Sequence, residues 1–487
     1  MKDYLKSSDI NFNLYATYII ITFIKKYENN PIVLESLKPQ FTKDNLVLLS
    51  ALLNKEHEKL IYNIIYILIV VSCFKEGETL FSLDENICCN IASFLGNNKI
   101  DNYLLCCGIS LLKNICINKN VCGIFIKYKI TEFFEEIYEK NLLNNKFMDC
   151  LMCSICNIIS FEMKKPKGFY NIPILLPCIK IISTQLRHNY PATSLHRYIY
   201  RLYELCDTGN SEICNELLNC KIHRDLINLY PTLAEYGDEL KNKLQKIISS
   251  QPELIITEEM KTMKNDMEYY ESSCLLILKF LGKLLFVIDD VLVQSLLNKG
   301  LADFLCNLLS SHDIRVIKNV SFCLSNICAG SYGQIAYLFK NNCLYDLIKV
   351  SKNVYDAMEV RKEKDDYYYQ LKDAFREIAH VFALAINNIL MEHCVALVKS
   401  NNYTVLLVLM KGLELFGDNN NNEYLISVIF EVIYKLNLLS NSFDNDNINF
   451  IMQKYGLKEN LEKIFQNKSL VYAQFAENLY NSLFGAF

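Results

Sequence analysis

Long stretches rich in leucine and isoleucine recur along the chain and are separated by short polar clusters. Two of them read LLILKFLGKLLFVI at residues 275–288 and LLNKGLADFLCNLL at residues 296–309. Neither stretch alternates apolar and polar positions as a half-buried strand does. Polar breaks fall at residues 96–98, 208–210 and 310–313. This pattern predicts helices of roughly 10–16 residues joined by brief loops, in a helical bundle or an α-solenoid.

An internal repeat separates these two architectures. One helical pattern recurs at residues 62–72, 107–117, 149–159, 195–207, 278–289 and 319–330. The equivalent positions Asn114 and Asn157 lie 43 residues apart, and Glu204 follows Asn157 after 47. Periods of about 40–47 residues are typical of stacked two- or three-helix units. We therefore predict an all-α solenoid, in which each unit packs only on its neighbours.

Two intervals between repeats are too long for a single unit. We place insertions near residues 234–270 and 352–375, within one solenoid that spans residues 1–487. The stretch 253–271 is acidic. It is either a solvated loop or helix edge, or a segment that lies across the groove of the solenoid or faces a basic partner.

Composition excludes several classes of protein. Of the 487 residues, 51% are hydrophobic, which excludes wholesale disorder. Only 15 glycines and 8 prolines are present, too few to supply the turns of a large all-β protein. The net charge of −4 argues against a dedicated nucleic-acid binder. The chain has no tryptophan, although it has 31 tyrosines and 27 phenylalanines.

The 20 cysteines are spread along the chain, and many lie inside apolar helical patterns, as Cys106, Cys107 and Cys323 do. This favours reduced, buried thiols in the cytoplasm or nucleus over a secreted disulfide scaffold. The longest apolar run, residues 61–74, contains Asn63 and is too short to span a bilayer. The N-terminus lacks the pattern of a signal peptide. We expect no transmembrane segment.

Metal-binding and catalytic motifs are weak or missing. Cys150, Cys153 and Cys156 have a C-x-x-C-x-x-C spacing, but no fourth ligand is nearby, so core thiols are the preferred interpretation. The same holds for Cys220 and His223, because a zinc site needs a second pair of ligands. No glycine-rich phosphate loop, nucleophile elbow or H-E-x-x-H motif is present. We expect no metal, no cofactor and no enzymatic activity.

Five segments carry a family resemblance. They are IRVIKNVSFCLSNICAGSYGQIAYLFKNNCLYDLIKV (314–350), RLYELCDTGNSEICNELL (201–218), VQSLLNKGLADFLCNLLSS (293–311), ATYIIITFIKKYENNPI (16–32) and YGLKENLEKIFQNKSLVYAQFAENLYNSLFG (455–485). In order and spacing they resemble the armadillo repeats of importin-α, the adaptor family that carries nuclear-localisation signals. The resemblance covers residues 12–485. It implies a right-handed superhelix of about ten three-helix armadillo repeats.

The resemblance also implies a binding groove. In that family a tryptophan four residues before an asparagine recurs on the third helix of several repeats. The indoles hold lysine and arginine stems, and the asparagine amide pairs with the backbone of an extended peptide. The positions that match this array are Tyr66, Ser110, Asn114, Cys153, Asn157, Tyr200, Glu204, Lys279, Lys283, Phe322, Asn326 and Asn388.

These matches predict an altered groove. Several asparagines remain, but no tryptophan does, so binding of a nuclear-localisation signal is expected to be weakened or lost. An asparagine could instead cap a turn or bond a neighbouring helix. The basic arm that binds importin-β in the family is missing before the first repeat, which makes importin-β a doubtful partner. We expect a cytoplasmic or nuclear protein that binds a protein or extended peptide. Two alternatives are a divergent but working import adaptor and a structural subunit of a larger assembly.

Overall fold

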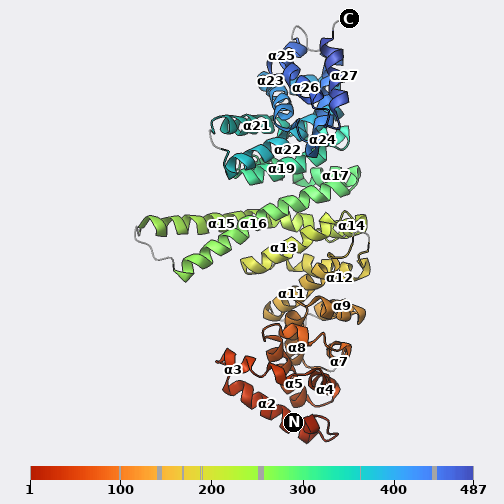
Figure 1. Cartoon of the computed structure of the whole chain (residues 1–487), viewed down its shortest axis with the longest axis vertical. Helices are drawn as coiled ribbons and strands as arrows, with labels where there is room; N and C mark the ends of the chain where they lie inside the picture. Colours follow the sequence, from red (N-terminus) through yellow and green to blue (C-terminus); the bar gives the residue numbers. More distant parts are fainter. Residues whose placement is uncertain are drawn as a thin grey trace. The chain divides into compact units, whose positions relative to one another are not determined.

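The computed structural model describes residues 2–97, 100–139, 145–166, 169–186, 188, 190–250, 257–361, 364–440 and 447–485. These residues form helices, turns and loops, and no strand occurs among them. The chain divides into two compact units, Met1–Ser273 (unit 1) and Cys274–Phe487 (unit 2) (Figure 1). Each unit is described separately below.

Unit 1 is a succession of three-helix repeats that follow α1 (Lys2–Leu5) and α2 (Ile10–Lys26). The first helices are short and the third helices are long. First helices are α3 (Pro31–Glu35), α6 (Gly77–Leu80), α9 (Lys119–Lys127) and α14 (Ser211–Asn219). Second helices are α4 (Lys43–Ala51), α7 (Glu85–Leu95), α10 (Ile130–Glu139), α12 (Ile172–Gln185) and α15 (Ile222–Ser250). Third helices are α5 (Glu58–Ser72), α8 (Asn102–Ile115), α11 (Asn145–Glu162), α13 (Ala192–Asp207) and α16 (Glu258–Val287), whose last part lies in unit 2. Short 3₁₀ helices, η1 (Lys38–Gln40) and η2 (Leu52–Asn54), flank α4.

Unit 2 continues the same order. Its helices are α17 (Asp290–Leu296), the π-helical turn η3 (Leu297–Leu301), α18 (Ala302–Leu308), α19 (Ile314–Cys328), α20 (Tyr332–Lys340), α21 (Cys343–Glu359), α22 (Asp366–Asn388), α23 (Met391–Phe416), η4 (Asn420–Asn422), α24 (Glu423–Leu438), α25 (Ile448–Lys454), α26 (Leu457–Gln466) and α27 (Ala473–Phe484). Residues 400–403 leave the helical conformation, so α23 supplies both the first and the second helix of its repeat. Together with the chemistry of the core, this order confirms the predicted all-α, armadillo-type solenoid.

Short polar residues begin many of these helices. The side chains of Asp101, Asn118 and Asp313 each accept a hydrogen bond from the backbone N–H two residues later, at 2.6, 3.0 and 2.8 Å. Asn210 caps α14 by accepting from the backbone N–H of Ile213, three residues later, at 3.1 Å; it follows Gly209, whose φ of +69° is the left-handed conformation that glycine adopts most easily. The polar clusters that interrupt the sequence pattern are therefore helix caps and turns.

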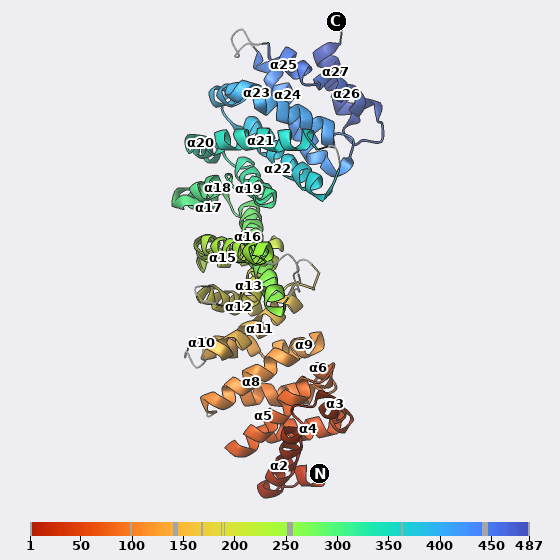
Figure 2. The ribbon, with the colours of Figure 1, turned by 90° about the vertical axis from the view of Figure 1, so that its left-hand side faces the viewer.

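Consecutive third helices pack against one another and form the core of each unit. In unit 1, α5 contacts α2 and α8, and α11 contacts α8 and α13 (Figure 2). In unit 2, α22 contacts α19 and α24. The facing sides are fully buried, as at Leu68, Ile109, Ile155 and Phe382. Burial of such side chains stabilises each unit by roughly 1.5–3 kcal/mol per residue before the entropy cost of folding is counted.

The two long intervals in the sequence correspond to lengthened helices. Residues 234–250 continue α15, and residues 258–270 are the first part of α16, so the two helices extend together beyond α13 (Figure 1). The two helices contact each other at Tyr236 and Tyr270, whose ring centroids are 5.6 Å apart. Residues 251–256, which join the helices, lie outside the described residues. Residues 352–375 lie largely in the end of α21 and the start of α22.

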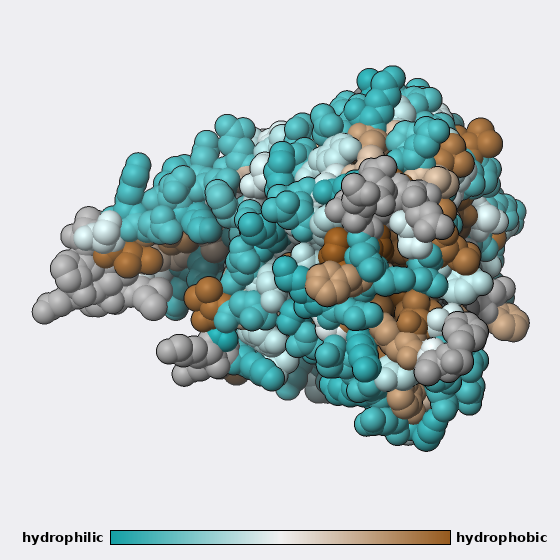
Figure 3. All heavy atoms as spheres, turned by 90° about the horizontal axis from the view of Figure 1, so that it is seen from above, coloured by the Kyte–Doolittle hydropathy of each residue, from teal (hydrophilic) through white to brown (hydrophobic). Residues whose placement is uncertain are grey.

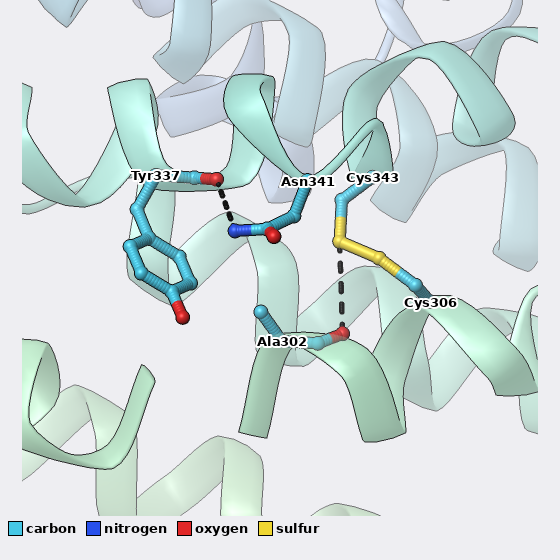
Figure 4. Close-up of a disulfide and its surroundings, with 5 residues drawn as sticks. All are labelled: Ala302, Cys306, Tyr337, Asn341 and Cys343. Carbon is cyan, nitrogen blue, oxygen red and sulfur yellow. Dashed lines mark hydrogen bonds between the residues drawn. A yellow bond between two sulfur atoms is a disulfide. The ribbon is translucent and has the colours of Figure 1, made fainter. Parts of the chain in front are cut away.

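One pair of cysteines is bridged. Cys306 of α18 and Cys343 of α21 form a disulfide with a Cα–Cα distance of 5.3 Å (Figure 4). For this pair the expectation of reduced thiols is wrong, because the second helices of two successive repeats lie close enough to join them. Eighteen other cysteines are free thiols.

The surface is mainly polar. On the face shown in Figure 3, hydrophobic side chains form small patches between hydrophilic ones, as on most folded proteins. Among the described residues, no helix combines the length and the apolar character needed to cross a membrane.

The disulfide gives a test of this packing. The bridge closes a loop with a sequence separation of 37, so its loss is expected to lower the free energy of unfolding of unit 2 by about 4 kcal/mol. Dithiothreitol should lower the melting temperature by roughly 10 °C, measured by calorimetry. The Cys306→Ser variant should melt at the lower temperature with or without dithiothreitol. A wild-type melting temperature that dithiothreitol leaves unchanged would contradict the disulfide.

Candidate peptide-binding surface on the third helices

The positions predicted to line a groove lie on the third helices. In unit 1 they are Tyr66 on α5, Ser110 and Asn114 on α8, Cys153 and Asn157 on α11, and Tyr200 and Glu204 on α13. In unit 2 they are Lys279 and Lys283 on α16, Phe322 and Asn326 on α19, and Asn388 on α22. Where one helix carries two of these positions, they are four residues apart, a spacing that places both side chains on one side of the helix. We call these sides the third-helix face of each unit.

Asn114 bonds the preceding repeat. Its Nδ2 donates to the Ser72 hydroxyl at 2.9 Å and lies 3.6 Å from the Cys73 sulfur, both at the end of α5. The side chain is half-buried. One of the two alternatives for these asparagines, a bond to a neighbouring helix, therefore holds at Asn114.

Two asparagines of unit 2 make the same kind of bond. The Nδ2 of Asn326 donates to the carbonyl oxygen of Gly282 on α16 at 3.0 Å. The Nδ2 of Asn388 donates to the carbonyl oxygen of Cys328, the last residue of α19, at 2.9 Å. Both side chains are half-buried. The amides thus join successive third helices.

Lys435 of α24 was missed by the sequence reasoning. Its Nζ donates to the carbonyl oxygens of Ile386, Asn387 and Ile389 at 2.7, 3.0 and 3.1 Å. These carbonyls lie at the end of α22, where a cation also interacts well with the helix dipole. Lys435 follows Asn388 after 47 residues, the step found between Asn157 and Glu204. The repeat period was the signal that could have identified it.

Asn157 and Glu204 do not follow this scheme. The side chain of Asn157 makes no hydrogen bond to the described residues. Glu204 forms an ion pair with Arg201 on its own helix. Next to Asn157, the buried sulfur of Cys153 accepts a hydrogen bond from Nη1 of Arg197 at 2.9 Å. Burial raises the pKa of the Cys153 thiol, so this side chain stays neutral at pH 7.

The aromatic candidates are already in contact with their own chain. The Nζ of Lys25 lies 5.8 Å from the ring centroid of Tyr66, and the guanidinium of Arg201 lies 5.3 Å from that of Tyr200. Phe322 packs against Gly282, where an added Cβ would come within 2.4 Å of the ring. The two rings are therefore already occupied by cations of the chain, and carboxylates lie near both: Glu204 pairs with Arg201, and the Glu28 charge acts on Tyr66.

The remaining candidates offer no aromatic surface. The Ser110 hydroxyl donates to the carbonyl oxygen of Cys106 at 3.1 Å, within its own helix. Lys279 is exposed and Lys283 is half-buried. The third-helix face of unit 1 thus brings together Tyr66, Ser110 and Asn114 along successive helices, and that of unit 2 brings together Lys283, Phe322 and Asn326.

The cysteine motifs lie in the packed interior. Cys153 and Cys156 are buried on α11, while Cys150 is half-buried. The Sγ of Cys220 lies 3.4 Å from Oε1 of Glu216, and burial raises the pKa of its thiol to about 11. A thiol must lose its proton to bind a metal, which burial makes costly. In the described part of the chain, no group of three or more His, Cys, Asp and Glu side chains could hold a metal ion.

His380 adds a titratable group to the third-helix face of unit 2. Its ring centroid lies 5.3 Å from that of Tyr424 on α24, and Arg376 precedes it by one turn of α22. Its Nε2 is buried and has no partner among the described residues. Burial, with a contribution from the Arg376 charge, lowers the pKa of His380 to about 4. The imidazole is therefore neutral in the folded protein at pH 5 and above.

Comparisons with known proteins support the fold alone. No protein-family model and no curated protein sequence matches the chain. The solved structure of an engineered protein from a structural genomics consortium matches with a TM-score of 0.61 and 12% identity, over 100% of this chain and 98% of that one. A designed armadillo repeat protein in complex with the peptide (KR)4 matches with a TM-score of 0.41 and 17% identity, over 63% of this chain and 99% of that one. Another designed armadillo repeat protein has a TM-score of 0.41 and 15% identity over the same shares.

The bond from Asn326 to Gly282 predicts a difference between two asparagines. Asn326→Ala should lower the free energy of unfolding by about 1 kcal/mol, because it removes a hydrogen bond between α19 and α16. Asn157→Ala should change it by less than about 0.5 kcal/mol, since no such bond is lost. Urea unfolding followed by circular dichroism measures both values. Equal losses in the two variants would contradict a bridging role for Asn326.

His380 predicts a pH dependence of stability. The unfolded state takes up a proton near the ordinary pKa of 6.5, whereas the folded state does so only near 4. Stability should therefore fall as the pH drops from 6.5 to 4, by up to about 3 kcal/mol, and the loss from this group should level off below pH 4. Thermal unfolding of the wild type and of His380→Gln across this range checks the claim. The variant should lose the corresponding part of the pH dependence.

Proposed function

We propose that the chain is a non-enzymatic protein that holds an extended segment of another protein along its third-helix faces. The observation that supports this most is the set of half-buried asparagine amides at equivalent positions, Asn114, Asn326 and Asn388. Stacked repeats suit such a task, because each one adds a few contacts to a long continuous surface.

The hydrogen-bonding capacity of these amides leaves room for a ligand. A primary amide has two donor hydrogens and an acceptor oxygen. Asn326 and Asn388 each donate one bond to a preceding helix. The second hydrogen and the Oδ1 remain to pair with the N–H and C=O groups of an extended backbone. A ligand can therefore use the amide without breaking the bond that joins the repeats.

The surroundings of the aromatic side chains favour neutral or apolar ligand side chains. Lys25 and Arg201 already lie near the rings of Tyr66 and Tyr200. A lysine or arginine of a ligand would have to displace these side chains before it could stack on the rings. We therefore propose that recognition of a basic nuclear-localisation signal is weak or lost.

We further propose that the chain shares its ancestry with importin-α. This rests on the order and spacing of the five resembling segments along the sequence. A cytoplasmic or nuclear location accords with that ancestry. No substrate, cofactor or catalytic residue is part of this proposal.

Fluorescence anisotropy with a labelled basic signal peptide tests the claim about basic ligands. Binding should be weaker than about 100 µM at physiological salt, because the aromatic faces carry cations. Binding at micromolar concentration or tighter would overturn this part of the proposal.

Selection from a library of displayed extended peptides tests the surface itself. Peptides enriched on the full chain should bind Asn114→Ala about ten-fold more weakly, since a bond to the peptide backbone is lost. The control is Asn120→Ala, which changes an exposed asparagine on the first helix α9 of the neighbouring repeat. Circular dichroism shows whether each variant is folded. Equal binding by the wild type and both variants would place the ligand elsewhere.

A further inference from the structure

Helix α2 exposes large apolar side chains on the side that faces away from α5. Its other side buries Ala16, Ile20 and Ile24. The outward side consists of Phe12, Tyr15, Tyr18, Ile19 and Phe23, which are 48%, 57%, 60%, 43% and 40% exposed. We call these five residues the α2 face. A single exposed apolar residue is ordinary, but five on one helix indicate a surface that is covered by something.

The packing of the other third helices shows what kind of element fits there. Helix α8 lies between α5 on one side and α11 on the other. Helix α2 packs on α5 as a third helix does, but no described helix covers the α2 face in the same way. Tyr4 of α1 contacts the first part of it, with its ring centroid 5.5 Å from that of Phe12 and 6.2 Å from that of Tyr15. The α2 face therefore has the chemistry of a helix-packing surface.

A hollow lies beside the α2 face. It measures about 250 Å³ and is bordered by Ile19 and Phe23 together with Leu37, Phe41 and Leu49. Phe41 and Leu49 are buried and form part of its apolar lining. A hollow of this size accepts one large apolar or aromatic side chain. Such a pocket with an aromatic anchor beside it is typical of the centre of a protein–protein interface.

The charges at the two ends of α2 are opposite. Asp9 caps the beginning of α2, and Lys25 and Lys26 lie in its last turn, all three exposed; Lys6 lies exposed just before the beginning. The helix dipole adds a positive end at the beginning and a negative end at the last turn. Two copies of α2 placed antiparallel would bring Asp9 of each beside Lys26 of the other. The α2 face is thus complementary to itself in one orientation.

We propose that the α2 face binds the α2 face of a second copy of this chain, with the two α2 helices antiparallel. In a pair centred between Thr17 and Tyr18, near the middle of the helix, Phe12 of each copy lies level with the Phe23 side of the hollow in the other. Asp9 of each copy lies level with Lys26 of the other. Every contact occurs twice, as in the isologous interface of a two-fold dimer. This pairing does not depend on the peptide-binding function proposed above.

Sedimentation velocity of the full chain tests the pairing. The wild type should shift with concentration, between about 1 and 100 µM, toward twice the mass of one 56.6 kDa chain. Ile19→Glu should raise the dissociation constant at least about 100-fold, because two carboxylates would meet near the two-fold axis. Tyr18→Glu, at a more exposed position, should do the same and guards against loss of folding in the first variant. Phe450→Glu is the control, since Phe450 is 65% exposed on α25 and should leave the dissociation constant unchanged.

Lys26→Glu tests the orientation. In the antiparallel pair, this change places the new carboxylate level with that of Asp9 of the other copy, at both ends. The dissociation constant should therefore rise about ten-fold at low salt. In a parallel pair, Lys26 would instead face Lys26 of the other copy, and the Lys26→Glu change would leave the dissociation constant nearly the same. A wild type that stays monomeric over the whole range, or a dimer that Ile19→Glu and Tyr18→Glu leave intact, would overturn the proposal.

Discussion

The contact between successive third helices is the constraint on which the rest of this structure depends. A single repeat cannot bury its long third helix, so α5 needs α2 and α8, and α22 needs α19 and α24. The apolar sides of these helices are fixed by that requirement. The sides that face solvent are not, and they are free to change as long as each helix still meets its neighbours.

This division explains how the fold and the binding surface can evolve separately. Phe322 keeps an aromatic ring over Gly282, where it also seals the packing of α19 on α16. The rings of Tyr66 and Tyr200 do not seal the packing of two helices in this way. They lie beside Lys25 and Arg201 of the same chain. The interior holds each unit together, while the side chains on the surface are not constrained by that packing.

Much of the fold follows from the sequence, because the helical period and the repeat step are properties of the backbone and the core. The step of 43 residues was enough to align Asn114 with Asn157, and the third helices lie where it places them. The contacts of individual side chains were harder to foresee. Nothing in the spacing showed that Arg201 would turn toward Tyr200, since that depends on a rotamer choice at the surface. The partner of Cys343 was equally hidden, because 20 cysteines allow many pairings and only the stacking of α18 and α21 selects Cys306.

The amide bonds between third helices couple two properties that are usually separate. Asn326 and Asn388 join successive third helices, and they are also the groups that we propose pair with a ligand. A ligand that polarises such an amide strengthens the donor hydrogen it leaves in place, because hydrogen bonds in series reinforce one another. In this proposal, a ligand bound at one of these amides therefore also strengthens the hydrogen bond between the two repeats that this amide joins.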